Sequence, residues 1–486
     1  MTISRARLVA DARTIAALGG PLLGNNLSVT GMSFVDTIMA GRLGAVDLAG
    51  LAIGAASFNL FMFFGFGLLM AVSPCVAHAY GANDPRRVTA YARQSWWLVL
   101  ALAVLQILGM QQARWFLPAI GITPDVLPVA IGYVEAVSWG MPGLMAFFAL
   151  RYTSEGLGRT KPIMYIGLCG FVVNAVGNWI FMYGKLGAPA LGAVGCGVAT
   201  ALTSWVMFLA MLFHMQLHRA YRAFAFFARV DRPDRRVIGE LTRVGLPIAG
   251  SILAEGGLFV AAALMMGGMG ATVAAGHQIA LNYAAFMFMV PLAISSATTI
   301  HVGHTLGKGD IRGARNAGLL GVALCAVVMT ISAVVILLFN DQIAALYTRD
   351  APVRELAATL LLMAALFQFS DGVQVGAAGA LRGFKDTTVP MALCVVAYWV
   401  LGFTFAYYFG VYRGEGPVLV WIGLNVGLTV SAVALVARYL SVTRRSLASI
   451  VQASTELAST ELASTDQASI DRSSAGRKSA VQRPAS

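Results

Sequence analysis

The sequence predicts an all-α membrane protein of twelve transmembrane helices, arranged as two pseudo-symmetric six-helix lobes. Hydrophobic residues make up 58% of the 486 residues and charged residues only 12%, with a mean hydropathy of +0.74. A soluble domain carries about 25% charged residues, so lipid is the expected solvent for most of this chain. Apolar stretches of membrane-spanning length, about 20 residues, follow one another along the sequence. An internal repeat divides these stretches into two sets of six.

Each apolar stretch between short polar breaks predicts one helix. The predicted helices cover residues 13–40, 47–80, 93–117, 127–153, 162–184, 190–217, 242–268, 272–304, 316–340, 351–381, 387–411 and 417–441. The first stretch follows a basic start, as a secretory signal does. It continues past Pro21 and Asp36 without a short apolar core and a cleavage site. We therefore expect it to be retained as the first helix.

The repeat appears when the sequence is compared with itself at a shift of 226 residues (247 − 21 = 226). The matched pairs include Pro21 and Pro247, Gly44 and Gly270, His78 and His304, Gly81 and Gly307, Asp84 and Asp310, and Arg86 and Arg312. Six helices per copy is an even number, so both copies enter the membrane in the same direction, about an axis along the membrane normal. This predicts transporter architecture, with an N-terminal lobe at 1–217 and a C-terminal lobe at 242–445.

The basic residues predict the topology of the chain. The net charge is +12, and most arginines and lysines fall in segments that share one side of the membrane, including the linker 218–241. This asymmetry places both termini in the cytoplasm of a bacterial inner membrane. The same asymmetry explains the positive net charge, so the charge does not indicate that the protein binds nucleic acid. For the linker, contact with anionic lipid is the alternative to a purely topological role. The tail 446–486 repeats five residues in STELASTELASTDQAS and is expected to be disordered.

Carboxylates within the predicted spans are the candidate functional groups. Asp36, Glu255 and Asp371 stand out among them, and none of the three has a lysine or arginine at helical spacing. A charge in the hydrocarbon region costs about 2.5 to 3.5 kcal/mol on insertion scales, so such residues are usually retained for ion or substrate binding. The alternative is a protonated carboxyl that joins helices. We expect these three to bind a coupling cation, and we expect no cofactor and no metal beyond a sodium ion at Glu255 and Asp371.

Helical spacing identifies the neighbours of these carboxylates, because residues three or four apart share a face. The predicted supporting residues are Ser251 beside Glu255, Phe367 and Gln374 beside Asp371, and the pair Asn174 and Asn178. Buried amides need partners, and Asp36 is the candidate partner of the asparagine pair. Helix association through amides alone is the alternative for this pair.

Other titratable residues carry less information. The five cysteines are scattered through the predicted spans and are expected to be reduced packing residues. His301 and His304 have the spacing of a ligand pair, but His304 repeats His78, so a symmetric helix-end contact is expected instead of a metal. Glu135 is expected near a helix end.

Four segments in order resemble the NorM branch of the MATE (multidrug and toxic compound extrusion) family. They are FVDTIMAGRLGAVDLAGLAIG, GAVGCGVATA, AGHQIALN and FQFSDGVQVGAAGALRGFKDT, and the resemblance covers about residues 10 to 440. It implies two lobes around a central V-shaped cavity, and export of small organic cations by antiport against sodium or protons. The family's acids match Asp36, Glu255 and Asp371, and its amides match Asn174 and Asn178.

One position departs from the family pattern. Relatives often have a tyrosine where this chain has Phe367. Phenylalanine lacks the hydroxyl oxygen that could bind a sodium ion, which weakens the case for sodium over protons.

Rival functions are a lipid-linked oligosaccharide flippase, which needs a strongly cationic cavity, and a membrane-embedded transferase, which needs an acidic metal motif such as DDxxD. The predicted spans are nearly free of lysine and arginine and contain no such motif. We therefore expect a monomeric multidrug efflux transporter and not an enzyme.

Overall fold

The computed structural model describes the backbone of residues 5–119, 121–229 and 231–480, and the side chains of these residues as far as 449. Within these ranges the regular structure is helical and no residue lies in a strand, which confirms the all-α class. The helices are α1 (Arg5–Gly41), α2 (Ala45–Met70), α3 (Val72–Gly81), α4 (Pro85–Met110), α5 (Ala113–Ala119), α6 (Leu127–Ser138), α7 (Met141–Gly156), α8 (Lys161–Tyr183), α9 (Ala193–Leu217), α10 (Arg219–Arg222), α11 (Arg235–Gly268), α12 (Ala271–Gly307), α13 (Ile311–Tyr347), α14 (Ala351–Gly383), α15 (Thr388–Val395), the π-helical η1 (Val396–Phe403) and η2 (Ala406–Tyr412), and α16 (Pro417–Ala480).

The described helices contain most of the predicted membrane spans. Ten helical segments are long and apolar enough to cross a membrane, and α6 with α7 makes an eleventh if this bent pair is one span. The helix α1 is 37 residues long, but Asn25 and Asn26 near its middle lower its hydropathy. The predicted count of twelve therefore depends on α1, whose two amides need partners inside the protein.

Several predicted helices differ in form from the prediction. The stretch 47–80 is divided into α2 and α3, and the stretch 387–411 into α15, η1 and η2. The stretch predicted at 127–153 consists of α6 and α7, which are bent by 49°. Gly140 and Pro142 lie at this break, and proline is favoured in the first turn of a helix because its missing N–H has no partner there. The stretch predicted at 93–117 begins earlier, at Pro85, because the Asp84 carboxylate accepts a hydrogen bond from the backbone N–H of Arg87 at 3.0 Å and caps α4.

The sequence repeat has a counterpart in local backbone structure. Gly44 before α2 has φ 144°, and its repeat partner Gly270 before α12 has φ 120°. Side-chain-bearing residues rarely adopt such angles, which accounts for glycine at both positions. Asp310 caps α13 by accepting from the N–H of Gly313 at 2.7 Å, as its partner Asp84 caps α4. The two copies thus start equivalent helices in the same way.

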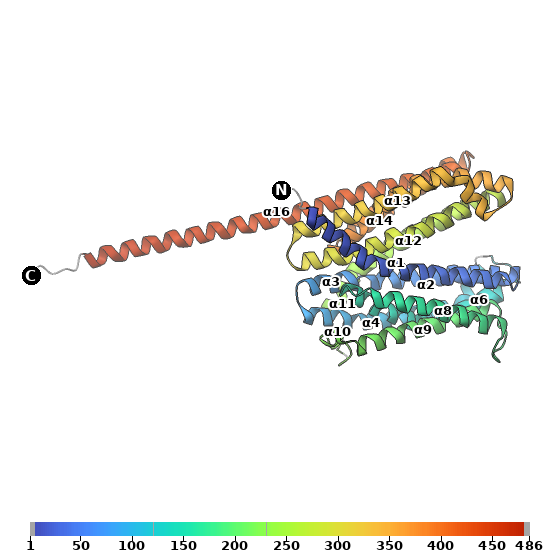
Figure 1. Cartoon of the computed structure of the whole chain (residues 1–486), viewed down its shortest axis with the longest axis horizontal. Coiled ribbons are helices and arrows are strands. Elements are labelled where there is room, and N and C mark those ends of the chain that lie inside the picture. The colour runs from blue at the N-terminus through green and yellow to red at the C-terminus, as the bar shows by residue number, and fades with distance from the viewer. Residues whose placement is uncertain (1–4, 120, 230, 481–486) are drawn as a thin grey trace, which may run out of the picture. The chain divides into compact units, whose positions relative to one another are not determined.

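Residues 1–436 form one compact unit, which contains the first lobe and the second lobe as far as residue 436 (Figure 1). In the first lobe α8 packs against α1 and α9, and in the second α14 packs against α12 and α13. The lobes meet through α1 with α12 and α2 with α11. A Cβ on Gly245 would lie 2.3 Å from the carbonyl oxygen of Leu68, so this approach of α11 to α2 requires glycine.

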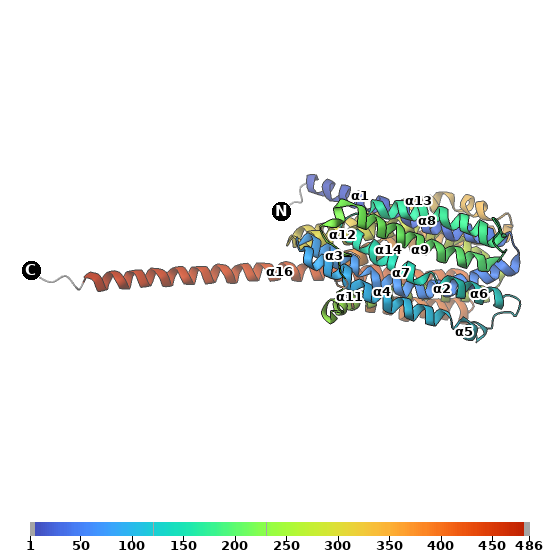
Figure 2. The ribbon, with the colours of Figure 1, turned by 90° about the horizontal axis from the view of Figure 1, so that it is seen from below.

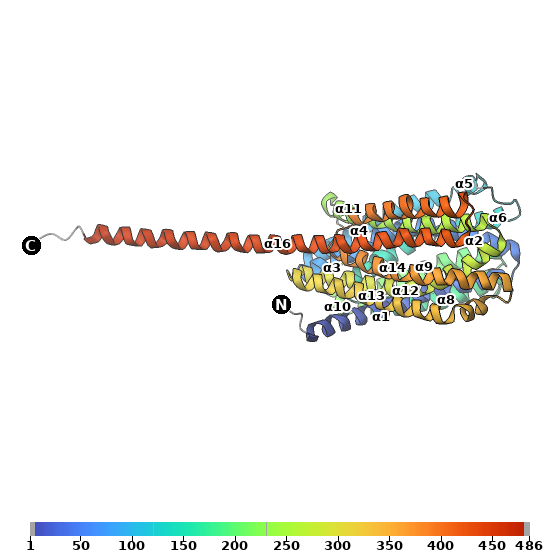
Figure 3. The ribbon, with the colours of Figure 1, turned by 90° about the horizontal axis from the view of Figure 1, so that it is seen from above.

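The lobes also touch through α3 and α12, at the end of the bundle that we call the inner end. This end carries the turns at 82–84, 157–160, 308–310 and 384–387 and is predicted to face the cytoplasm. A Cβ on Gly81 would lie 2.3 Å from the His304 oxygen, and one on Gly307 would lie 2.2 Å from the His78 oxygen. Repeat partners therefore face each other at a symmetric contact. Figures 2 and 3 show the start of α1 at this end, with α5 and α6 at the opposite end.

Residues 437–486 form the second unit. The backbone is helical from Pro417 to Ala480 within α16, whereas the five-residue repeat predicts a disordered tail from 446. Alanine, glutamate, leucine and glutamine favour helix, and the first helix-breaking residue after 446 is Gly476. Residues 481–486 of the predicted tail lie outside the described residues.

Candidate functional site

The candidate site is a cavity of about 550 Å³ between α2 of the first lobe and helices α11, α12, α14, α15 and α16 of the second. Aromatic and thioether side chains make up much of its wall, namely Phe63, Phe66, Met70, Phe259, Phe288, Met289 and Phe367. Three acidic residues line it, Glu255, Asp371 and Asp386, against one basic residue, Arg382. Aromatic faces and methionines around a net negative wall suit an organic cation.

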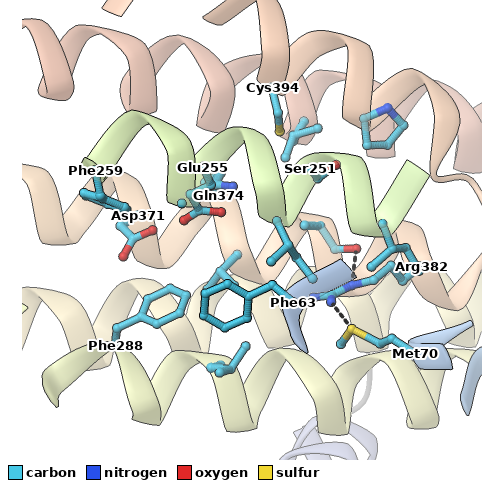
Figure 4. Close-up of a pocket in the computed structure, with 18 of the residues that line it drawn as sticks. Phe63, Met70, Ser251, Glu255, Phe259, Phe288, Asp371, Gln374, Arg382 and Cys394 are labelled. Atoms are coloured by element: carbon cyan, nitrogen blue, oxygen red, sulfur yellow. Dashed lines mark hydrogen bonds between the residues drawn. The ribbon is translucent and has the colours of Figure 1, made fainter. Parts of the chain in front are cut away.

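The two carboxylates predicted in the second lobe both reach this cavity. Glu255 projects from α11 and Asp371 from α14, and Figure 4 shows them facing the same space, with Gln374 beside Glu255. Asp371 is only 4% exposed. Its Oδ1 and the Oε1 of Gln374 are buried and accept no hydrogen bond from any described residue. Buried acceptors without donors are rare and costly, so this pair is suited to a proton or a cation.

The remaining predicted residues of the second lobe surround the carboxylates. Ser251 lines the cavity one turn from Glu255, and its hydroxyl donates to the Pro247 carbonyl at 3.0 Å. The Phe367 ring packs edge-on against Trp421, with ring centroids 5.8 Å apart. Phe367 is 3% exposed and supplies no oxygen to the site. The structure therefore brings Ser251, Glu255, Phe367, Asp371 and Gln374 to one cavity.

Asp36 belongs to a separate cluster inside the first lobe. The Asn178 amide of α8 donates to the Asp36 carboxylate of α1 and to the Asn174 oxygen at 3.3 Å. Asn174 in turn donates to the Thr200 hydroxyl at 3.5 Å. The expected partnership between the asparagine pair and Asp36 is thus present. None of these residues lines the cavity of the second lobe.

Arg382 is the residue of the cavity that sequence reasoning misplaced. The predicted helix 351–381 ends one residue before it, but α14 extends to Gly383 and carries Arg382 into the cavity wall. Its guanidinium donates to the Ser295 hydroxyl at 2.9 Å and contacts the Met70 sulfur of the first lobe at 3.1 Å (Figure 4). The expectation that the spans are nearly free of basic residues is therefore wrong at this position.

Two other buried polar groups escaped the sequence analysis. Arg151 and Glu155 form an ion pair within α7, with 2.7 Å between Nε and Oε1. Their spacing of four residues was the signal for it, although the predicted span 127–153 ends two residues before Glu155. His277 of α12 is 2% exposed, and neither ring nitrogen has a hydrogen-bond partner among the described residues. Its ring packs edge-on against Trp421, with centroids 5.7 Å apart.

Hydrogen bonds between the described parts of the two lobes gather at the inner end. His304 bonds to the Gly156 carbonyl at 2.7 Å, and His301 bonds to the Asp11 carboxylate at 2.9 Å. Both histidines thus make helix-end contacts, as predicted. Glu135 lies at the other end, where Arg114 donates to it at 2.6 Å.

Family comparison identifies the group to which this chain belongs. The MatE family model matches it twice, at residues 21–180 and 247–408. The matches begin 226 residues apart (247 − 21 = 226), which is the shift of the internal repeat. The chain belongs to the MatE family. The two matches correspond to the two lobes, and this MatE chain is a multi-pass membrane transporter and not an enzyme.

Curated relatives are similar over nearly the whole MatE chain. A probable multidrug resistance protein NorM of Xanthomonas campestris is 41% identical over 91% of this chain and 96% of its own length. A multidrug resistance protein MdtK of Yersinia pseudotuberculosis is 39% identical over 92% of this chain and 99% of its own length. These relatives support the resemblance to the NorM branch.

Solved structures share the fold of the MatE chain. An outward-facing multidrug resistance MATE transporter has a TM-score of 0.82 at 22% identity, covering 92% of this chain and 99% of that one. A eukaryotic MATE transporter has a TM-score of 0.79 at 17% identity, covering 90% and 99%. At these identities the likeness establishes the architecture alone.

Proposed function

We propose that this chain exports small organic cations from the cytoplasm across the bacterial inner membrane, by antiport against sodium ions or protons. The observation that carries the proposal is the pair of buried, unpartnered oxygens on Asp371 and Gln374, in an aromatic cavity that also holds Glu255. The curated relatives, named multidrug resistance proteins, support the choice of substrate class.

Competition for the carboxylates supplies the coupling. Without a bound cation, Glu255 and Asp371 are two negative charges in a wall of rings and thioethers, and an organic cation neutralises them while its apolar part packs against Phe259 and Phe288. A proton or a sodium ion removes that attraction, because the carboxylates then have their own positive partner. Entry of the coupling cation therefore releases the organic cation.

A one-for-one exchange moves no net charge, because one cation enters as one organic cation leaves, so the gradient of the coupling cation drives it. Each further cation that enters moves one net charge, which supplies about 2.3 kcal/mol down about 100 mV and supports an additional gradient of roughly fifty-fold. Each exchange also needs access to alternate sides of the membrane. The glycine contact of α3 with α12 and the Arg382 contact with Met70 both join the lobes. Rocking of the lobes would break these contacts and open the inner end.

The charge of the cavity argues against the flippase alternative. A diphosphate headgroup needs several cations, whereas the wall carries three acidic residues and one arginine. The guanidinium of that arginine is also engaged by Ser295 and Met70.

Purified protein in liposomes tests the proposal. Ethidium movement is followed while a sodium gradient or a pH gradient is imposed alone. Movement under one of the two gradients identifies the coupling cation. If neither gradient drives ethidium, nor any other organic cation, antiport is the wrong mechanism. If diphosphate-linked lipid crosses the bilayer instead, the flippase reading replaces it.

A further inference from the structure

A second cavity lies in the first lobe, away from the carboxylates. It has a volume of about 890 Å³ and lies between the start of α1, the start of α8, the end of α9 and α10. Its polar wall consists mainly of Arg13, Arg159, Lys161, His214 and His218. These residues lie at the predicted cytoplasmic end, where the headgroups of the inner leaflet are expected. We propose that this cavity binds the headgroup of an anionic phospholipid.

The charge of the cavity is positive and not neutralised. No aspartate or glutamate lines it. Among the described residues, Arg13, Arg159 and Lys161 form no ion pair, whereas Arg7, Arg93 and other cytoplasmic-end arginines do. Positive-inside topology alone requires only that basic residues lie on this side. It does not require three of them around one cavity without a carboxylate.

Arg159 is held in place by buried groups. Its guanidinium lies over the Tyr221 ring, 4.9 Å from the centroid. The Tyr221 hydroxyl is 2.7 Å from the Ser154 hydroxyl, which donates to the Arg159 carbonyl at 2.7 Å. Tyr221 is 2% exposed and Ser154 is fully buried. A cation fixed in this way loses little entropy when it binds a phosphate, and its planar donors match phosphate oxygens.

The surroundings favour a lipid over a soluble phosphate. Tyr165 lines the cavity and is 63% exposed, and Leu168 and Val172 continue its face along α8. Phe213 and Leu209 form a similar exposed face along α9. The α8 face begins at the cavity with Tyr165, and both faces run along the helices toward their opposite end. A lipid can therefore place its phosphate in the cavity while its acyl chains lie along these faces. Basic pockets between helices on the cytoplasmic side are known to bind such headgroups.

The full-length protein in phosphatidylcholine nanodiscs tests this site. Binding of spin-labelled phosphatidylglycerol and cardiolipin is measured against spin-labelled phosphatidylcholine. Each of Arg13→Gln, Arg159→Gln and Lys161→Gln is expected to weaken anionic-lipid binding about fivefold, since one basic residue near the surface contributes about that factor. The triple variant should weaken anionic-lipid binding about a hundredfold. The single variants keep the test valid if the triple variant does not fold.

A matched control separates the cavity from general charge. Arg86, Lys308 and Arg312 are exposed basic residues at the same end and line neither cavity. Their triple glutamine variant has the same net charge as the cavity variant and should bind anionic lipid nearly as wild type. Equal loss in both variants would overturn the proposal in favour of diffuse attraction. Full displacement of the lipid by inorganic phosphate would overturn it in favour of a soluble ligand.

Chemical labelling locates the lipid independently. Lys161 and Lys308 are both exposed, so both react with an amine-acylating reagent in phosphatidylcholine alone. Addition of cardiolipin should protect Lys161 severalfold and leave Lys308 unchanged. Equal protection of the two lysines would contradict a specific site.

Discussion

At the scale of single residues, Asp371 has the clearest chemical consequence. Its Oδ1 is buried, accepts no hydrogen bond from any described residue, and shares the cavity with Glu255. A carboxylate in this setting gains a partner only when a cation or a proton enters. The aromatic wall then decides which organic cations fit, because rings and thioethers repack around varied shapes.

Asp371→Asn should therefore weaken ethidium binding by about ten- to a hundredfold, since interactions with a charged partner contribute about 1.5 to 3 kcal/mol. Asparagine keeps the shape of the side chain, so the fold should persist. Asp341→Asn makes the same change at an exposed carboxylate that pairs with Arg354 outside the cavity. Fluorescence titration of both variants provides the comparison. Equal affinities in the two variants would exclude a role for Asp371 in binding.

The Asp36 cluster makes a prediction about stability. Asn178→Ala removes the amide that donates to Asp36 and leaves a partly buried carboxylate with one donor fewer. The expected cost is about 1 to 3 kcal/mol, visible as a lower melting temperature. Asn282→Ala truncates an exposed asparagine and should change it little. If the two variants have the same melting temperature, the cluster does not stabilise the fold of the first lobe.

At the scale of helices, the contact of α3 with α12 holds the inner ends of the lobes together. Gly81 and Gly307 allow it, since a Cβ on either would come within 2.3 Å of a carbonyl oxygen of the other lobe. Backbone atoms cannot move aside as a flexible side chain can, so alanine must push the helices apart.

Gly81→Ala should therefore favour an open inner end. Spin labels at the exposed positions 86 and 312, one in each lobe, report the separation in a Cys169→Ser background. The distance distribution should shift to longer values. Gly239→Ala provides the control, because no atom lies within 4 Å of its added Cβ. An unchanged distribution in Gly81→Ala would show that the contact does not limit opening.

Arg7 of α1 adds a pH-dependent contact between the lobes. Its hydrogen bond to Asp310, with its positive charge, holds the pKa of that carboxyl below its ordinary value. The contact therefore stabilises the protein above the unfolded pKa of about 3.9 and is lost as the pH falls through the lower folded value. Both side chains are partly exposed, so we expect at most about 1 kcal/mol.

Melting curves of wild type and Arg7→Gln test this contact. Their difference should be constant above about pH 5 and shrink as the pH falls below the unfolded value of about 3.9. Arg5→Gln, two residues away and outside any described ion pair, should match wild type throughout. A difference that persists at the acid end would assign the effect to helix propensity instead.

At the scale of the whole molecule, the sequence predicts the lobes and part of the site. Hydropathy and the repeat anticipate the two six-helix copies, and the cost of a buried charge identifies Glu255 and Asp371 without tertiary information. Arg382 could not be placed in this way, since a basic residue at a helix end is typical of topology. The direction of the Arg382 side chain depends on how far α14 extends and on its contact with Met70 in the other lobe. Contacts between lobes require the folded backbone.

The central claim is that Glu255 and Asp371 couple cation entry to export. Gradient-driven ethidium export from proteoliposomes tests it most directly, with Glu255→Gln, Asp371→Asn and the control Asp341→Asn compared at equal protein. We predict loss of at least about tenfold in both cavity variants, which corresponds to about 1.4 kcal/mol, and wild-type export in the control. Full-rate export by either cavity variant would contradict the claim.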